Sequence, residues 1–475
     1  MKSSIVLGIV FFVHFSFSQS INLKDVSNQY DYVIITVPQF ESTCQQFKQH
    51  KETVRGFRVL IVDTTAIYQQ FDSCTANEDR IRHFISYAGT YWKNPQPKYF
   101  LIAGDLNKIP NYSFVTLPEY QYTDTTKTDF YFSESIYDED TTTINFYVGR
   151  IAAKTTTDLE NYFQKVITYE NNLLISEWDN TSLVVADDEK NASGEEGEIW
   201  KNISLILRDN YLPTFLNRKL YSSSDTSIYF GNKDSITSFL ENKGASTLFF
   251  IGHGNSTQFT HENLFNVSDV PLLNVGQKYF FVSFLAKQQF SDSNSTSITD
   301  QMLFNESQAI GGMSPLGLYY ADLNSNVINN FAKYLYSGYH LTVGQVMDSI
   351  FINDKTSFKK IFGVFGDPSL KLKYGIIADV NGGQDLVVSD FLMEQNFPNP
   401  FNPTTTFQFS LPKAGNVHLK IFDVLGNEVA SVADGFYNSG TYKIVFSGER
   451  LASGIYLYTL NSGNFHQSKK MILMK

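Results

Sequence analysis

His253 lies between two glycines, directly after a short apolar run. The run is Thr247–Ile251, and the sequence then reads Gly252-His253-Gly254-Asn255. A short, mostly apolar run that ends at a glycine is typical of a buried strand, and parallel sheets build their sites at the carboxyl ends of strands. Glycine in this place lets a ligand approach the backbone closely. An imidazole there could work as a general acid and base, although an isolated Gly-His-Gly is as readily a turn without chemistry.

The next apolar run, Tyr279–Phe284, is a second candidate strand. If it pairs with Thr247–Ile251, its carboxyl end at Leu285–Phe290 lies beside His253. The segment Leu285–Phe290 is therefore the candidate for the other half of a site.

Apolar strands alternate with amphipathic segments from about residue 21 to residue 375. The candidate strands are 32–37, 57–62, 99–103, 183–186, 247–251 and 279–284, and the candidate helices are 45–54, 78–92, 159–170 and 196–209. Short apolar strands that alternate with helices indicate a parallel α/β sheet covered on both faces. Such a sheet would place His253 at its carboxyl edge.

Cys44 and Cys74 are the two cysteines of the chain. In an exported protein they could form a disulfide, and closing this loop of about 31 residues would stabilise the fold by roughly 4 kcal/mol. The sequence leaves their pairing open. Neither belongs to a CxxC metal motif.

Several acidic residues cluster between the candidate strands of the first half. Asp129, Asp138 and Asp140 could supply oxygen ligands for a structural Ca²⁺. The alternative is a solvated acidic loop.

The pattern of predicted elements changes near residue 390. Short alternating strands follow at 406–411, 417–423, 441–446 and 455–460, separated by turn-rich strings. Strands at about ten-residue spacing indicate a small β-sandwich. Residues 396–475 hold 7 basic and 4 acidic residues, a net charge of +3, whereas the preceding part has 30 basic and 44 acidic residues and a net charge of −14.

Length and charge narrow the classes of function. The 475 residues suggest two to four domains, and 42% hydrophobic residues are ample for a sizeable core. A formal net charge of −11 argues against nucleic acid as a partner, because binding to phosphates depends on Lys and Arg. Residues 1–18 have a basic start, an apolar stretch and small residues near the end, which is typical of a secretory signal peptide. No later segment is long and apolar enough to span a membrane.

The C-terminal strings NFPNPFNPTTTFQFSLP, IFDVLGNEV and SGIYLY resemble the C-terminal sorting domain of proteins exported through the type IX secretion system. The resemblance covers about 80 residues, 396–475. It implies that this module is an immunoglobulin-like β-sandwich that directs the chain across the outer membrane, to the cell surface or the extracellular space. The machinery of that system would be a partner, and function would reside in residues 21–375.

Residues 30–375 resemble the gingipain family of cysteine peptidases. The likeness is carried in order by YDYVIIT, RGFRVLIVD, YFLIAGDLNKIP, TDFYF, YVGRIAAKT, KVITYENN, FFIGHGN and FGDPSLKL. It implies a caspase-like three-layer α/β/α sandwich in two subdomains, 21–175 and 176–375. A linker at 376–395 would join them to the sorting domain.

The resemblance also implies roles for single residues. His253 matches the catalytic histidine, and the N–H of Gly254 would be an oxyanion donor. The carboxylate that orients the histidine would be Asp187 or Asp188, although both could belong to a solvated acidic loop. The family mechanism is acyl transfer from a cysteine thiolate, and the likeness also favours the calcium site.

This chain differs from the family at the position of the nucleophile. In gingipains the cysteine ends the strand after the histidine, a few residues before an aromatic residue. Counting back from Phe290 places it at Leu285, or at Ala286 if the register slips by one. Neither side chain can attack a carbonyl. Ser283 has a hydroxyl, but its side chain should lie one step deeper on the same face of the sheet as Leu285.

Three hypotheses follow from this pattern. The first is a secreted, cell-surface pseudoenzyme of the gingipain family that binds peptides or surface partners through the cleft that holds the substrate in active members. The second is an active peptidase with an unconventional nucleophile. The third is a non-enzymatic surface scaffold or adhesin.

Overall fold

The computed structural model describes residues 21–474 except for short gaps. The gaps are 117–123, 139–143, 173, 188–189, 192–193, 196–198, 215, 223–228, 260–263, 287, 293, 318–320, 338–339, 352–359, 375–391, 394, 397, 412–414, 438–439, 449–450 and 464. The chain forms two compact units, one ending at Tyr374 and one formed by the residues after it, together with Ser337–His340. The predicted signal peptide and most of the predicted linker lie outside the described residues. Within those residues, no helix is long and apolar enough to cross a membrane.

A ten-stranded sheet forms the centre of the first unit. Its order is β10 (Asn217–Ser222), β7 (Thr181–Ala186), β11 (Thr247–Ile251), β15 (Phe280–Leu285), β16 (Ala309–Pro315), β17 (Phe362–Phe365), β6 (Tyr147–Ile151), β3 (Tyr99–Ala103), β1 (Tyr32–Thr36) and β2 (Val59–Asp63). Neighbouring strands are parallel except β16 and β17, which are antiparallel. The predicted parallel sheet is therefore interrupted by one antiparallel pair.

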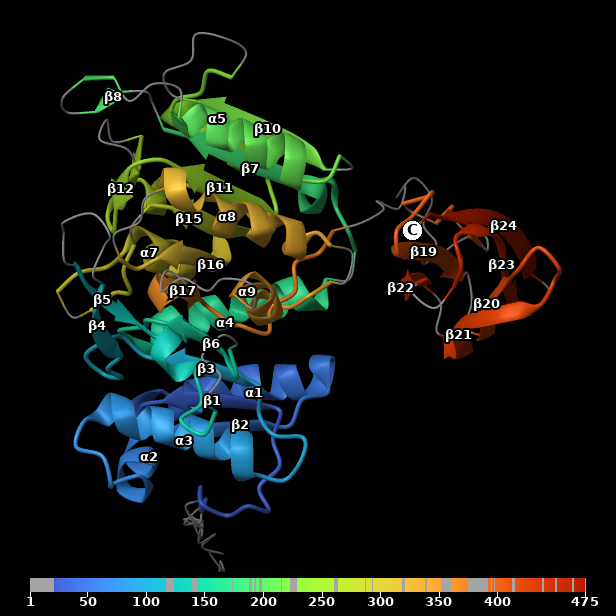
Figure 1. Ribbon diagram of the computed structural model, residues 1–475. Coiled ribbons are helices and arrows are strands. Elements are labelled where there is room, and N and C mark those ends of the chain that lie inside the picture. The colour runs from blue at the N-terminus through green and yellow to red at the C-terminus, as the bar shows by residue number, and fades with distance from the viewer. Residues whose placement is uncertain are drawn as a thin grey trace, which may run out of the picture. The chain divides into compact units, whose positions relative to one another are not determined.

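Helices cover both faces of this sheet. They are α1 (Glu41–Arg55), α2 (Thr64–Gln70), α3 (Asn77–Tyr91), α4 (Thr156–Asn171), α5 (Ile199–Ile206), α6 (Lys233–Asn242), α7 (Ile298–Phe304), α8 (Ala321–Leu335) and α9 (Val343–Phe351). A π-helical turn, η4 (Leu207–Tyr211), extends α5. Figure 1 shows α5 and α8 on one face of β7, β11 and β15. The result is the expected three-layer α/β/α arrangement.

Alternating side chains of β11 and β15 identify the two faces near His253. Phe249 and Phe281 both pack against Phe331 of α8. The intervening Phe250 and Phe284 instead pack against Phe259, which belongs to the short strand β13 (Gln258–Phe259). Side chains two residues apart therefore share a face, as strand geometry requires.

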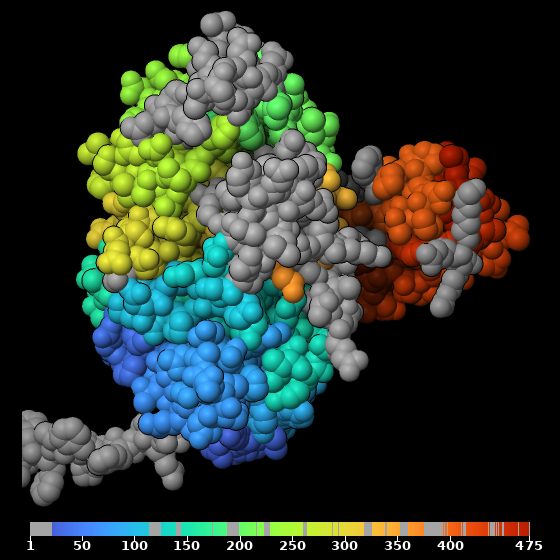
Figure 2. Space-filling model, turned by 60° about the vertical axis from the view of Figure 1, so that its left-hand side comes forward, coloured from blue at the N-terminus to red at the C-terminus, as the bar shows by residue number. Residues whose placement is uncertain are grey.

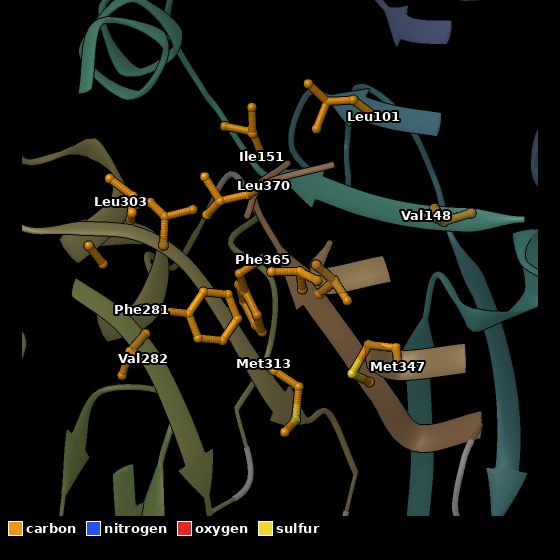
Figure 3. Packing of buried hydrophobic residues seen from close by; sticks show 14 of the residues in the cluster. Leu101, Val148, Ile151, Phe281, Val282, Leu303, Met313, Met347, Phe365 and Leu370 are labelled. Carbon is orange, nitrogen blue, oxygen red and sulfur yellow. The ribbon is translucent and has the colours of Figure 1, made fainter. Parts of the chain in front are cut away.

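The middle of the sheet is packed as one continuous core. Figure 3 shows Phe281, Met313, Phe365 and Val148, from β15, β16, β17 and β6, among the buried side chains of one cluster. The two predicted subdomains thus share a hydrophobic core across β16, β17 and β6.

The second unit is a β-sandwich of two antiparallel sheets. One contains β18 (Leu392–Met393), β19 (Thr404–Leu411) and β22 (Gly440–Ser447), and the other has the order β21 (Glu428–Tyr437), β20 (Gly415–Phe422), β23 (Gly454–Ser462) and β24 (Phe465–Leu473). Phe407, Leu419 and Tyr458 belong to its own buried cluster. The space-filling view shows this unit in orange to red (Figure 2).

Candidate active site

Asp187 and His253 follow two neighbouring strands. β7 and β11 pair in parallel with Ala186 opposite Ile251, so both residues emerge at the carboxyl edge. The backbone N–H of Asp187 donates to the carbonyl of Ile251 at 2.9 Å, which fixes the loop after β7 against β11. Pairing in register therefore brings together two side chains that lie 66 residues apart in the sequence.

One carboxylate oxygen of Asp187 holds both the backbone and the ring of His253. Oδ2 accepts the backbone N–H of His253 at 2.6 Å and lies 3.0 Å from its Nδ1. A side chain on Gly252 would place its Cβ 2.2 Å from the Asp187 Cβ, so glycine is required for this approach. The Asp187 side chain is 1% exposed, whereas that of His253 is 28% exposed. With Nδ1 held by the carboxylate, Nε2 is the ring atom suited to proton transfer.

Trp200 contacts His253 from the first turn of α5. The two rings meet edge to face, with centroids 5.0 Å apart and an interplanar angle of 75°. This half-buried indole was missed by the sequence analysis. The signal for it was faint: a tryptophan, one of three in the chain, within the predicted helix 196–209.

Leu285 ends β15 and lies opposite Ile251 in the parallel register with β11. It is two residues beyond Ser283 and four beyond Phe281, so all three side chains point to the α8 face. Ile251 points to the same face, as does the His253 ring, which contacts α5. Leu285 is 2% exposed. The Cβ of Ala286 faces the other way, 3.2 Å from where a Cβ on Gly254 would lie.

Ser283 offers a hydroxyl on this face but is completely buried. Its Oγ has no hydrogen-bond partner within the described part of the chain. A serine nucleophile needs an adjacent base within hydrogen-bond reach, and no such contact joins Ser283 to His253 among the described atoms.

Gln288 links the loop after β15 to the loop after β11. Its Nε2 donates to the carbonyl of Asn255 at 2.9 Å, and its backbone N–H donates to Pro315 at 2.8 Å. Thr299 Oγ1 donates to Gln288 Oε1 at 3.2 Å. This buried amide was also missed, because a glutamine in a loop carries no distinctive sequence signal.

Asp300 lies beneath the same loop, in the first turn of α7. Its Oδ2 accepts the backbone N–H of Ser291 at 2.7 Å and the hydroxyl of Ser297 at 3.0 Å. Its Oδ1 is buried without a partner within the described residues. Burial raises the pKa of Asp300 to about 6, against the opposing effect of these hydrogen bonds and of Arg150.

The sequence model of peptidase family C25 matches residues 25–373. The chain belongs to this family. Residues 395–474 match the secretion system C-terminal sorting domain, so this C25 protein carries a type IX sorting tail that marks it for export across the outer membrane, to the cell surface or the extracellular space. No curated protein matches the chain.

Solved structures of gingipains share the fold. The Arg-specific cysteine proteinase gingipain R (RgpB) is 16% identical, with a TM-score of 0.60 over 94% of this chain and 98% of that chain. The complex of Porphyromonas gingivalis RgpB pro- and mature domains is 17% identical, with a TM-score of 0.59 over 93% of this chain and 100% of that chain. At this identity the likeness establishes the caspase-like architecture alone.

Both cysteines of this C25 protein lie far from His253. Cys44 is on α1, which packs against β2, and Cys74 follows α2; both are free thiols. Five strand positions separate β15 from β1, which corresponds to roughly 24 Å. Burial raises the pKa of the Cys44 thiol to about 12, so it is unreactive at neutral pH.

The acidic residues predicted to bind Ca²⁺ do not gather in the described region. Asp129 forms a two-point ion pair with the buried Arg150, at 2.6 and 2.8 Å. Asp138 accepts a hydrogen bond from Asn145 at 2.6 Å. Asp140 lies outside the described residues, as does Asp188. No cluster of three potential metal ligands occurs among the residues that are described, and Asp129 is a poor ligand because Arg150 occupies both of its oxygens.

Proposed function

We propose that this C25 protein is a secreted surface pseudoenzyme, which binds peptide or protein ligands at the His253 edge of the sheet without cleaving them. In this proposal the chain has the acid/base pair of a peptidase, His253 and Asp187, but lacks the nucleophile. One observation carries it: the strand end that pairs with the His253 strand finishes in a buried leucine, Leu285.

Acyl transfer needs a group that attacks the peptide carbonyl. His253 could move a proton, Asp187 could orient the imidazole, and the Gly254 N–H could donate to an oxyanion. A leucine supplies neither a lone pair nor a proton. Because the members of such a site act as a unit, loss of the nucleophile alone removes most of the rate enhancement.

Ser283 is the candidate for an unconventional nucleophile in an active peptidase. Its burial and its lack of a hydrogen bond to His253 weigh against it. Cys44 and Cys74 are excluded by their distance along the sheet. The pseudoenzyme therefore has better support than the peptidase.

A pure scaffold would not need a reachable imidazole. His253 keeps 28% of its side chain exposed over a buried Asp187, and Trp200 flanks it. Partly exposed aromatic and imidazole rings at a strand edge suit contact with a ligand. This favours a binding role over the scaffold hypothesis.

The test is incubation of the purified full chain with a peptide library at neutral pH, with and without thiol and with and without Ca²⁺. We expect no cleavage in any arm. We also expect peptides to bind, detected as retention on the immobilised protein, and to bind more weakly when His253→Ala removes the imidazole.

A matched variant distinguishes the site from the rest of the surface. His83 lies on the helix α3, between β2 and β3 in the chain and far from β11 in the strand order, so His83→Ala should leave peptide retention unchanged. Cleavage that His253→Ala abolishes would overturn the pseudoenzyme. Absence of any retained peptide would instead favour the scaffold.

A further inference from the structure

The outer face of the four-stranded sheet in the sorting domain is divided into a polar and an apolar end. At the polar end His418, Asn461 and His466 lie side by side in register. At the other end Phe422 is opposite Leu457, and Ile455 is opposite Ile472. Side chains on the inner face, such as Leu419 and Tyr458, fill the core. The apolar end is therefore not needed to build the sandwich.

The hairpin between β20 and β21 extends this apolar end. Val424 and Leu425 at its turn are 71% and 83% exposed, and Ile455 and Leu457 on β23 are 48% and 45% exposed. We call Phe422, Val424, Leu425, Ile455, Leu457 and Ile472 the apolar tip. Grouped exposed apolar side chains are unusual on a soluble domain and mark interaction surfaces.

The turn that presents Val424 and Leu425 is held rigidly. Asp423 accepts the backbone N–H groups of Leu425 and Asn427, each at 2.9 Å, and the side-chain amide of Asn427 at 2.9 Å. A preorganised turn loses little conformational freedom on binding. The two exposed apolar side chains are therefore held ready for contact.

The apolar tip coincides with the strings that resemble sorting domains. Val424 and Leu425 belong to IFDVLGNEV, and Ile455 and Leu457 belong to SGIYLY. Ile421 in the first string and Tyr456 and Tyr458 in the second are buried in the core of the sandwich. The exposed Val424, Leu425, Ile455 and Leu457 do not belong to that core, so a role in recognition accounts for their apolar character.

The charges around the apolar tip indicate the chemistry of a partner. Glu428 pairs with Lys420 at 2.8 Å, and Asp434 pairs with His418 at 2.8 Å. Lys470, which lies opposite Leu457 in the register, forms no ion pair with a described residue. Glu428 is thus neutralised by Lys420, whereas the Lys470 ammonium beside Leu457 has no such partner among the described residues and can attract an acidic group.

We propose that the apolar tip docks into an apolar groove with an acidic rim on a protein of the secretion machinery. This inference goes beyond the proposed function and does not depend on it, because it concerns export and not the His253 site. The sorting-domain match over residues 395–474 supplies the requirement for a protein receptor.

The test uses the full-length chain in a cell that exports it. The double variant Val424→Asp/Leu457→Asp places charges in the apolar tip. Its matched control, Ser431→Asp/Ser468→Asp, places the same charges one row away on the same face, at two exposed serines. We expect the first to lower the surface-exposed amount by roughly tenfold or more, with accumulation in the periplasm, and the control to export normally.

The same experiment checks that the variants fold and identifies the protein that binds the apolar tip. Both variants should keep the thermal unfolding transition of the parent, since all four positions point to solvent. A photo-crosslinker at position 457 should capture a protein of the secretion machinery, and one at position 468 should not. Lys470→Glu should also reduce export.

Three outcomes would overturn the proposal. Normal export of Val424→Asp/Leu457→Asp would show that the secretion machinery does not recognise the apolar tip. A dimer in analytical ultracentrifugation that dissociates on Leu457→Asp would assign the surface to a second copy. Binding of the purified chain to phosphatidylethanolamine/phosphatidylglycerol vesicles, lost in the same variant, would assign it to lipid.

Discussion

Asp300 is a buried acid that holds the backbone of Ser291 in the loop after β15. Its pKa of about 6 in the folded chain exceeds the value of 3.8 expected when the chain is unfolded. Between these values the folded protein holds more protons than the unfolded chain. The contribution of Asp300 to the free energy of unfolding is therefore fully present below about pH 4. It is lost as the pH rises to about 6 and above.

We expect Asp300→Asn to flatten the pH dependence of stability between pH 4 and pH 7. A shift of about two pKa units corresponds to a loss of about 3 kcal/mol in the parent over this range, which the variant should not show. Urea unfolding of both proteins at several pH values measures it. The exposed Asp72→Asn is the control and should follow the parent; an unchanged slope in Asp300→Asn would contradict the assignment.

In the proposed assignment, Leu285 holds the place of the nucleophile, at the end of the strand that pairs with the His253 strand. In Leu285→Cys we expect iodoacetamide to modify residue 285 at pH 7 roughly tenfold faster than Cys44 of the same molecule, because a neighbouring His promotes the thiolate. His253→Ala in the same background should remove most of that advantage. Peptide mass spectrometry gives both rates, and equal rates with and without His253 would show that the two side chains do not meet.

Buried ion pairs fix α1 against α4 and the segment after β17. Lys51 Nζ lies 2.8 Å from both carboxylate oxygens of Glu170 and 2.7 Å from Asp367 Oδ2. His50 and Arg55, on the same helix, also contact Glu170. Although burial raises the pKa of Glu170, the charge of Lys51 and the hydrogen bonds with His50 and Lys51 outweigh that effect and hold the pKa below its usual value.

We expect Lys51→Met to cost roughly 3 to 5 kcal/mol of unfolding free energy, because two buried carboxylates lose their shared cation. Lys48→Met, one turn earlier on α1, removes only an exposed pair with Glu52 at 3.8 Å and should cost less than about 1 kcal/mol. Chemical denaturation compares the two. Similar losses in both variants would show that the buried network contributes little.

The sequence predicted those elements whose local pattern agrees with their place in the fold. The predicted strands at 99–103 and 247–251 coincide with β3 and β11, and α3 and α4 differ from prediction by a few residues. β16 was missed because its Gly311-Gly312 and Pro315 read as a loop. Those glycines are there because a Cβ on Gly311 would lie 2.9 Å from the Phe281 ring, so tertiary packing overrides strand propensity.

The site could be predicted only where a strand end marked it. His253 and Asp187 each follow an apolar run, and pairing in register brings them into contact. Leu285 was found by counting from an aromatic residue, and the register places it opposite Ile251. Trp200, Gln288 and Asp300 reach the site from a helix turn and a loop. Their positions depend on packing, which no local pattern encodes.

The two units have separate cores. Each has its own buried cluster, and residues 396–475 carry a net charge of +3 against −14 for the residues before them. A unit with its own core should unfold independently.

Differential scanning calorimetry of the full chain should therefore show two transitions. A chain that ends at residue 374 should keep only one of them, at an unchanged temperature, and should no longer be exported. A lower transition temperature in the shortened chain would mean that the sorting domain stabilises the C25 unit.

The most direct measurement of the central claim is intact-mass spectrometry after incubation with peptidyl acyloxymethyl ketones of varied sequence, which trap a nucleophile beside a catalytic histidine. The account predicts no adduct on the parent chain at pH 7.5 and one adduct, at residue 285, on Leu285→Cys. An adduct on the parent that disappears with His253→Ala, at Ser283 or at any other residue, would contradict it.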